Sequence, residues 1–302
     1  MRFKNSTILV TGGTGTFGNA FIRRVLECSP KKVIVYSRDE FKQYNMEREV
    51  KDSRVRYFIG DVRDSNRLAR ALHGVDYVVH AAAMKQVPAC EYNPNEAIKT
   101  NIIGAMNVID CAIDAKVKKV VALSTDKAVH PINLYGATKL CSDKLFTAAN
   151  AYSGEGGTVF CIVRYGNVAG SRGSVIPLFK EMVGRGVKTL PLTHEEMTRF
   201  YITIDEAVDL VFKAFEVGAG GDVFVKKIPS FRIKDFISSL GCKPEINGIR
   251  PGEKVHEIMI TEDDAPKVTE HAEYYIIHPE AKNVMPAGFK YSSDVNETWL
   301  FT

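Results

Sequence analysis

A short polar stretch and a downstream tyrosine–lysine pair carry the side chains best suited to acid–base chemistry. Residues 124–127 (Ser-Thr-Asp-Lys) follow the apolar run 119–123, whose length and β-branched content are typical of a buried strand. We expect a helix over about 134–149, so that Tyr135 and Lys139, four residues apart, share one face. An ammonium group near a phenol lowers the pKa of the phenol, which predicts that Tyr135 acts as a general base or acid near neutral pH.

Thr125, Asp126 and Lys127 add a hydroxyl, a carboxyl group and an amine beside that pair. Ligands of open parallel sheets bind at the carboxyl ends of strands, where these three residues are expected. Adjacent opposite charges are also common in loops as surface ion pairs. Asp126 and Lys127 alone support the two interpretations about equally, and the downstream Tyr135 and Lys139 favour catalysis.

The chain begins with a strand, a glycine-rich turn and a helix, in that order. Glycines 12, 15 and 18 allow a tight turn, a close approach of backbone to a pyrophosphate, and packing of the helix on the strand. Placed between a strand and a helix, this spacing predicts a dinucleotide site. The cofactor-binding residues expected here are Gly12, Thr14, Gly15, Thr16, Phe17 and Gly18.

The end of the second expected strand, over 32–36, indicates which dinucleotide binds. Sites that prefer NAD place an acid there, whereas Ser37, Arg38 and Lys42 offer donors and positive charge, which predicts NADP. The alternatives are that Arg38 and Lys42 are solvated surface charges, or that Asp39 turns inward. We also expect the cofactor to contact Asp61 and Val62 after the third strand, and Ala81 and Ala82 after the fourth.

Strands and helices alternate up to a strand over 158–165, which predicts an α/β fold with a doubly wound parallel Rossmann sheet. A helix over about 95–115 carries Asn101, whose amide is expected to brace the backbone of the active site. Because the alternation ends after this point, we expect a smaller, interleaved C-terminal lobe. We predict that the NADP-binding domain comprises residues 1–170 and also 200–225. The lobe is predicted to comprise residues 171–199 and 226–302.

Composition excludes several classes of protein. The 302 residues carry 40 basic and 36 acidic side chains, a net charge of +4 without a long basic run, which argues against nucleic-acid binding. No apolar stretch approaches the roughly 18 residues of a membrane span. The six cysteines lack metal-ligand spacing, so no metal site is expected. These features predict a cytoplasmic protein.

Motifs spread over nearly the whole chain resemble the extended short-chain dehydrogenase/reductase family that acts on nucleotide sugars. They are similar in particular to the inverting UDP-N-acetylglucosamine 4,6-dehydratases of the PseB type, which start pseudaminic acid synthesis. The motifs are TGGTGTFG at 11–18, YSRDE at 36–40, GDVRD at 60–64, STDKA at 124–128, PINLYGATK at 131–139, RYGNVAGSRGSV at 164–175, MTRF at 197–200, IRPGEK at 249–254 and YSS at 291–293. The sequence Met-Lys-Gln at 84–86 departs from the expected Leu-Lys-His.

The resemblance implies a role for each residue of the catalytic group. Tyr135, assisted by Lys139, would remove the proton of the sugar C4 hydroxyl while NADP+ takes a hydride from C4, with Thr125 holding that hydroxyl. Lys127 would be the base at C5, its pKa lowered by burial beside Lys139 and the cofactor's charged ring. Asp126 would protonate the departing C6 hydroxyl, its pKa raised by burial.

The substrate would be UDP-N-acetylglucosamine. Arg199 and Arg250 are candidates for its diphosphate, because a guanidinium can bind phosphate oxygens with two hydrogen bonds. Glu253 is a candidate for ribose hydroxyls, Asn167 for a sugar or phosphate oxygen, and Lys85 for the sugar pocket, although a solvated loop lysine is nearly as well supported there.

Other functions stay open on the sequence. A nucleotide-sugar 4-epimerase would need the tyrosine but not the Asp126–Lys127 pair, and a C5-retaining dehydratase would resemble relatives with Asp-Glu at those positions. A protein that binds NADP without turnover is disfavoured by the intact Tyr135 and Lys139. Relatives form dimers or hexamers, so a homo-oligomer is expected.

Overall fold

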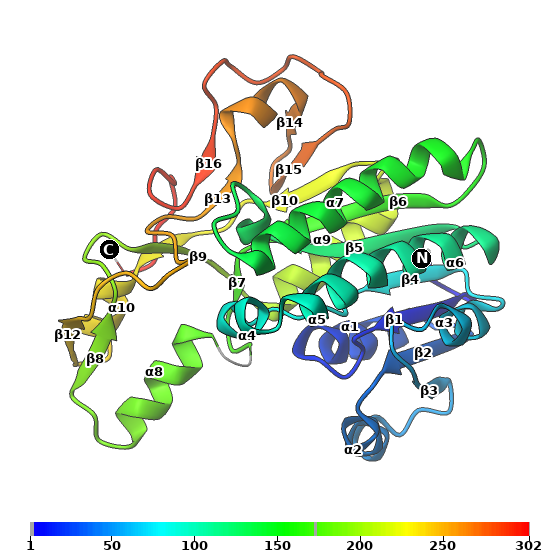
Figure 1. Cartoon of the computed structure of the whole chain (residues 1–302), viewed down its shortest axis with the longest axis horizontal. Coiled ribbons are helices and arrows are strands. Elements are labelled where there is room, and N and C mark those ends of the chain that lie inside the picture. Colours follow the sequence, from blue (N-terminus) through cyan, green and yellow to red (C-terminus); the bar gives the residue numbers. More distant parts are fainter. Residues whose placement is uncertain (1–2, 172–173, 302) are drawn as a thin grey trace.

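The computed structural model describes residues 3–171 and 174–301. Its centre is a nine-stranded sheet in the order β14-β15-β10-β6-β5-β4-β1-β2-β3 (Figure 1). The strands from β3 to β10 in this order are parallel, and β15 and β14 are antiparallel to their neighbours. The order β3-β2-β1-β4-β5-β6 is that of a doubly wound Rossmann sheet, so the predicted fold class is confirmed. The strands are β1 (Thr7–Thr11), β2 (Lys32–Ser37), β3 (Val55–Ile59), β4 (Tyr77–His80), β5 (Lys119–Thr125), β6 (Val159–Tyr165), β10 (Val223–Lys226), β14 (Val268–Glu270) and β15 (Tyr274–Ile277).

Helices form a layer on each side of the sheet. Helices α3, α6 and α7 pack side by side in one layer, and α1 packs against α9 in the other. Strands β1, β4 and β6 between them are almost fully buried, which explains their continuous apolar runs. The helices are α1 (Thr16–Leu26), α2 (Glu40–Val50), α3 (Ser65–Leu72), α4 (Val87–Tyr92), α5 (Pro94–Ile98), α6 (Gly104–Asp114), α7 (Leu134–Ser153), α8 (Val175–Gly184), α9 (Ile204–Val217) and α10 (Ile233–Ser239). No helix in the described part of the chain has both the length and the apolar character needed to cross a membrane.

The segment predicted as one helix over 95–115 is divided. A π-helical turn, η1 (Lys99–Ile103), separates α5 from α6 and places Asn101 at a buried position. The Asn101 amide accepts from Met84 N at 2.8 Å and donates to Met84 O at 2.9 Å and to Thr138 Oγ1 at 3.0 Å. Asn101 thus braces the loop after β4 against α7, as predicted, and the π turn lies beside a candidate site, as such turns often do.

The C-terminal lobe has a small core of its own, around Phe179, Leu192, Phe231 and Phe236. It contains three small sheets, with the orders β11-β9-β7, β12-β8 and β13-β16. Their strands are β7 (Asn167–Val168), β8 (Thr189–Leu192), β9 (Thr198–Ile202), β11 (Ser230–Arg232), β12 (Lys243–Ile246), β13 (Ile258–Ile260) and β16 (Tyr291–Ser292). The 3-10 turns η2 (Asp126–Ala128) and η3 (Glu262–Lys267) complete the assignment.

One part of the segment 226–302, which we expected in the lobe, lies in the main sheet instead. Strands β14 and β15 continue the nine-stranded sheet beyond β10. Their apolar side chains, including Ile276 and Ile277, belong to the main core and cover an edge strand that would otherwise be open.

Candidate active site

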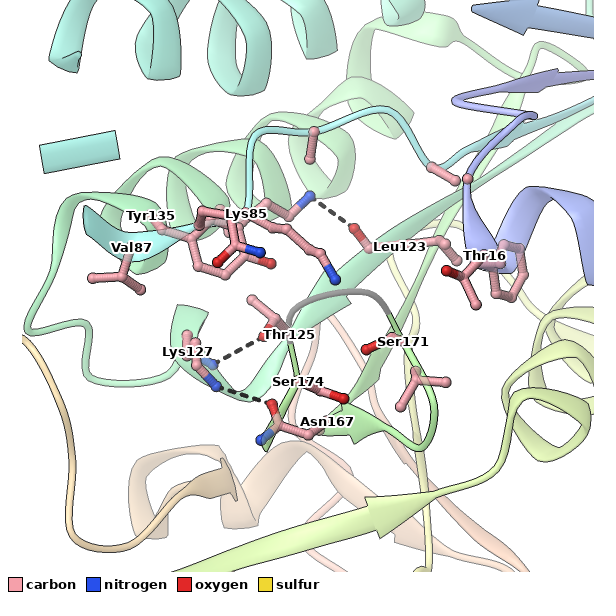
Figure 2. A pocket seen from close by; sticks show the side chains of 18 of the residues that line it. Thr16, Lys85, Val87, Leu123, Thr125, Lys127, Tyr135, Asn167, Ser171 and Ser174 are labelled. Carbon is pink, nitrogen blue, oxygen red and sulfur yellow. Dashed lines mark hydrogen bonds between the residues drawn. The ribbon is translucent and has the colours of Figure 1, made fainter. Parts of the chain in front are cut away.

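A cavity of about 1030 Å³ runs along the carboxyl ends of the parallel strands and reaches the C-terminal lobe. Every residue predicted to bind cofactor or substrate lines it, and so do Thr125, Lys127, Tyr135 and Lys139. Asp126 does not line it, because its side chain is fully buried. Figure 2 shows Thr125, Lys127, Tyr135 and Asn167 gathered around one part of the cavity.

The catalytic group is assembled where β5 ends and η2 begins. The Thr125 hydroxyl caps η2 by accepting from Lys127 N at 3.3 Å. The Lys127 amine donates to Asp126 Oδ1 at 3.2 Å, to Glu257 Oε1 at 3.2 Å and to Asn167 Oδ1 at 3.4 Å. Three acceptors fix the amine at the wall of the cavity, so the pair Asp126–Lys127 is not a solvated surface ion pair.

Asp126 has the raised pKa that the sequence predicted. Burial raises it, and the nearby negative charge of Glu257 raises it further, against the lowering effects of Lys127 and Thr125. Its Oδ1 accepts from Thr125 Oγ1 at 3.0 Å, while its buried Oδ2 has no hydrogen-bond partner among the described residues. Asp126 is thereby suited to hold a proton.

The predicted lowering of the Lys127 pKa is wrong for this structure. Burial does act against the charged amine, but the carboxylates of Asp126 and Glu257 outweigh it and raise the pKa of Lys127. The sequence prediction placed Lys127 beside Lys139 and could not include Glu257. The amine therefore rests as an ammonium ion between two carboxyl groups.

The predicted lowering of the Tyr135 pKa by Lys139 is also wrong for this structure. The Lys139 amine donates to the carbonyl oxygen of Leu123 at 2.7 Å, and burial lowers its own pKa. Burial raises the pKa of Tyr135 to about 12, and the groups that act in the opposite direction are Lys127 and the Thr125 hydroxyl. Helical spacing puts Tyr135 and Lys139 on one face, as expected, but the charge acting on the phenol is that of Lys127.

The cofactor half of the cavity is formed by the glycine turn and the ends of β1, β2 and β4. Gly12 has a φ of +65°, and a β carbon there would lie 2.9 Å from the backbone of Ala81. Helix α1 begins after Gly15 without a side-chain cap, so its first N–H groups face the cavity as phosphate donors. These residues fit a dinucleotide cofactor.

The predicted determinants of NADP lie at the end of β2. Asp39 caps α2 by accepting from Lys42 N at 2.9 Å and pairs with the Lys42 amine at 2.8 Å, so it is turned toward its own helix. Arg38 lies 3.7 Å from Asp61, and its side chain is more than half exposed. The Ser37 hydroxyl accepts from Thr14 at 3.2 Å.

The predicted substrate residues differ in burial, and Asn167 and Glu253 are partly buried. Lys85 and Arg250 are exposed, and Arg250 lies 3.4 Å from Glu253. Arg199 is buried and donates to the carbonyl oxygens of Thr198 at 2.7 Å and Val255 at 3.0 Å. It also lies 3.5 Å from Glu253, so a diphosphate would have to compete with that carboxylate. In the quoted motif RYGNVAGSRGSV, Arg172 and Gly173 lie outside the described residues.

Sequence reasoning missed Glu257, which lines the cavity. It lies 130 residues after Lys127 in the chain, just past the motif IRPGEK, and no spacing rule connects the two. The available signal was a carboxylate three residues after Lys254 and directly before the apolar strand Ile258–Ile260.

Known proteins resemble this chain over nearly its full length. The family described as "Polysaccharide biosynthesis protein" matches residues 8–279. A Campylobacter jejuni protein named UDP-N-acetylglucosamine 4,6-dehydratase (inverting) is 50% identical, over 98% of this chain and 95% of the relative. A Rickettsia prowazekii protein named UDP-glucose 4-epimerase is 44% identical, over 93% and 85%. The X-ray structure of Pen from Bacillus thuringiensis superposes with a TM-score of 0.92 and 40% identity, over 99% of this chain and 96% of that one.

These matches agree with the motifs and with the strand order of the central sheet. The protein belongs to the polysaccharide biosynthesis protein family, among the extended short-chain dehydrogenase/reductases.

Proposed function

We propose that the protein is an NADP-dependent UDP-N-acetylglucosamine 4,6-dehydratase that inverts C5, a hydro-lyase acting at the start of pseudaminic acid-type sugar synthesis. The observation that carries this proposal is the Lys127 amine at the cavity wall, 3.2 Å from the buried carboxyl group of Asp126 and close enough to Tyr135 to influence its pKa. The name of the Campylobacter relative supports the same reaction and substrate.

Tyr135 and Thr125 serve the first step. Tyr135 takes the proton of the C4 hydroxyl. Thr125, whose side chain is hydrogen-bonded to Tyr135, holds that hydroxyl in place. The dinucleotide held by the glycine turn would supply a nicotinamide as hydride acceptor for C4 and hydride donor for C6. The charge of Lys127 favours the phenolate of Tyr135 during proton removal.

Asp126 and Lys127 serve the elimination. Transfer of one proton from the Lys127 amine to Asp126 Oδ1 gives a neutral amine and a carboxylic acid, without a change in net charge. The amine then removes the proton at C5, which the C4 ketone has acidified. Because Asp126 is shielded from the cavity, its proton reaches the departing C6 hydroxyl through Thr125 or Lys127, both of which it contacts. The C6 hydroxyl leaves as water, and a proton derived from solvent adds to the opposite face of C5, which inverts that centre.

The selection of NADP over NAD is proposed to depend on Ser37, Arg38 and Lys42. The adenosine and nicotinamide halves of the cofactor are proposed to lie along Asp61, Val62, Ala81 and Ala82. The orientation of Asp39 supports this choice, because its carboxylate caps α2 instead of facing a ribose. Arg250, Arg199, Glu253, Asn167 and Lys85 are proposed for the UDP-sugar. A homo-oligomer, dimer or hexamer, remains our prediction.

A 4-epimerase is the second candidate, favoured by the name of the Rickettsia relative. Incubation with UDP-N-acetylglucosamine in heavy water, followed by proton NMR, separates the two. We expect a 4-keto-6-deoxy sugar deuterated at C5, with the coupling constants of the inverted centre. A galacto-configured product would establish epimerisation, the same ketone with retained C5 would establish the retaining reaction, and an unchanged substrate would leave only binding.

A further inference from the structure

The carboxylate of Glu257 has no role in the reaction derived so far, although it touches the central amine. It is 2% exposed, lines the cavity and accepts from Lys127 at 3.2 Å. Its Oε2 is buried and has no hydrogen-bond partner among the described residues. A buried ionised carboxylate with an unused oxygen is costly unless neighbouring charges compensate it, so its position calls for an explanation.

We propose that Glu257 is the positioning residue of the catalytic group: it holds the Lys127 amine at the cavity wall and sets the protonation of the Asp126–Lys127 pair. This inference rests on the proposed function. Lys127 lies 3.2 Å from each of two carboxyl groups, that of Asp126, which is fully buried, and that of Glu257, which lines the cavity. Without Glu257, the amine would keep Asp126 as its one carboxylate partner.

The C-terminal part of the chain is built to hold Glu257 in place. Ser293 donates its backbone N–H to Glu257 O at 2.8 Å, and its Oγ accepts from Glu257 N at 2.9 Å. The same hydroxyl lies 2.6 Å from Thr198 Oγ1, next to the buried Arg199. The motif YSS at 291–293 therefore acquires a structural role, because it fixes the backbone of Glu257 through the β13–β16 pairing.

The charges around the pair decide its protonation. Asp126 and Lys127 face Glu257 from η2, Arg199 from β9 and Lys254 from the polar loop, while Tyr135 on α7 acts on Lys127. Burial acts against ionisation of Glu257, but Lys127, Arg199 and Lys254 outweigh it and keep its pKa low. The ionised Glu257 raises the pKa of both Asp126 and Lys127. It thus favours the protonated forms of both groups.

The variant Glu257→Gln keeps the shape of the side chain and removes its charge. Both pKa values of the pair should fall, so both limbs of the pH profile of kcat should move to lower pH. The maximum of kcat should fall by about 10- to 100-fold as the amine loses its anchor. Glu257→Asp should keep both limbs in place with a smaller loss. A purely structural role would lower kcat in both variants without moving the limbs, and that result would overturn the proposal.

A matched control and a second measurement complete the test. Glu253→Gln removes from the same cavity a carboxylate that pairs with Arg199 and Arg250. This variant should change KM without moving the limbs of the pH profile. The second measurement is an NMR titration of lysine labelled with ¹³C at Cε, in which the Lys127 signal is assigned by its loss in Lys127→Met. The titration should show a lower Lys127 pKa in Glu257→Gln than in the wild type. An unchanged Lys127 pKa would overturn the inference even if the wild type proved to have a different activity. An inactive wild type with the expected shift would instead contradict the proposed function alone.

Discussion

The carbonyl oxygen of Lys127 occupies space that a side chain on Gly136 would need: a β carbon there would lie 2.1 Å from it. Gly136 is the residue after Tyr135, and it lies in the first turn of α7, which Asn133 caps by accepting from Gly136 N at 2.8 Å. This close approach brings the tyrosine on α7 against the turn that carries Asp126 and Lys127. The relative position of phenol and amine therefore depends on the absence of a side chain at residue 136.

Gly136→Ala should separate α7 from η2. We expect a loss of stability of about 1–3 kcal/mol, because overpacking of a close contact must be relieved by backbone shifts. The activity should fall by about 100-fold as Tyr135 moves relative to Lys127. Urea unfolding and steady-state kinetics measure the two effects. Gly184→Ala is the control, since no atom beyond its chain neighbours and the backbone of its own helix lies within 4 Å of a β carbon there, and it should leave both values nearly unchanged.

Arg38→Ala should weaken the binding of NADP+ more than that of NAD+. Loss of a charged hydrogen bond to the additional phosphate costs about 1.5–3 kcal/mol, or roughly 10- to 100-fold in Kd. Isothermal titration with both cofactors measures this difference. Arg48→Ala, in α2 and outside the cavity, should change neither Kd. Equal losses for both cofactors in Arg38→Ala would contradict the assignment.

His80 should make the protein less stable in mild acid. Burial lowers the pKa of His80 to about 3, with the charge of Lys139 acting in the same direction. Because this pKa lies below the usual value near 6.5, the unfolded chain binds more protons than the folded protein between about pH 3 and pH 6.5. The stability gained from neutral His80 is therefore full above about pH 6.5 and is lost as the pH falls toward 3. The linkage amounts to a few kcal/mol, about 5 at most.

The variant His80→Asn tests this linkage. Its amide can replace the ring nitrogen that lies 2.9 Å from Thr11 Oγ1, but it does not titrate. Urea midpoints between pH 4 and 7.5 should depend less steeply on pH in the variant than in the wild type. Parallel pH dependence in the two proteins would show that His80 does not titrate on unfolding in this range.

The two candidate diphosphate arginines should respond differently to removal. Arg250 is exposed, so Arg250→Ala should raise KM for UDP-N-acetylglucosamine by about tenfold or more and leave the unfolding free energy nearly unchanged. Arg199 is buried near Glu253 and Glu257, so Arg199→Ala should cost about 3–5 kcal/mol of stability by leaving buried charges without compensation. Substrate kinetics together with urea unfolding distinguish the two. A stable Arg199→Ala protein with a changed KM alone would show that Arg199 has no structural role.

Local sequence patterns predicted most of the Rossmann sheet. The apolar runs of β1, β2 and β4 to β6 are buried on both faces, so each run identifies its strand without knowledge of its neighbours. The π turn over Lys99–Ile103 was not predictable in this way, because one residue added to a turn barely disturbs the apolar periodicity. The place of β14 and β15 in the main sheet depends on pairing with β10, a contact between distant parts of the chain.

The candidate site shows the same division. Thr125, Lys127, Tyr135 and Lys139 come from neighbouring segments, and they line one cavity as their spacing predicts. The direction of the Lys127 pKa was wrong because it depends on Glu257, which tertiary structure brings to the amine from 130 residues away. Spacing gives the members of a local group, and the charge state of that group depends on distant residues.

The central claim is that the Lys127 amine removes the C5 proton after oxidation at C4. The direct measurement is proton NMR of UDP-N-acetylglucosamine incubated in heavy water with Lys127→Met, whose fold is verified by circular dichroism and cofactor binding. We expect formation of the 4-keto-6-deoxy sugar and deuteration at C5 to fall by about 100- to 10,000-fold relative to the wild type. Wild-type rates of C5 deuteration in the folded variant would contradict the account.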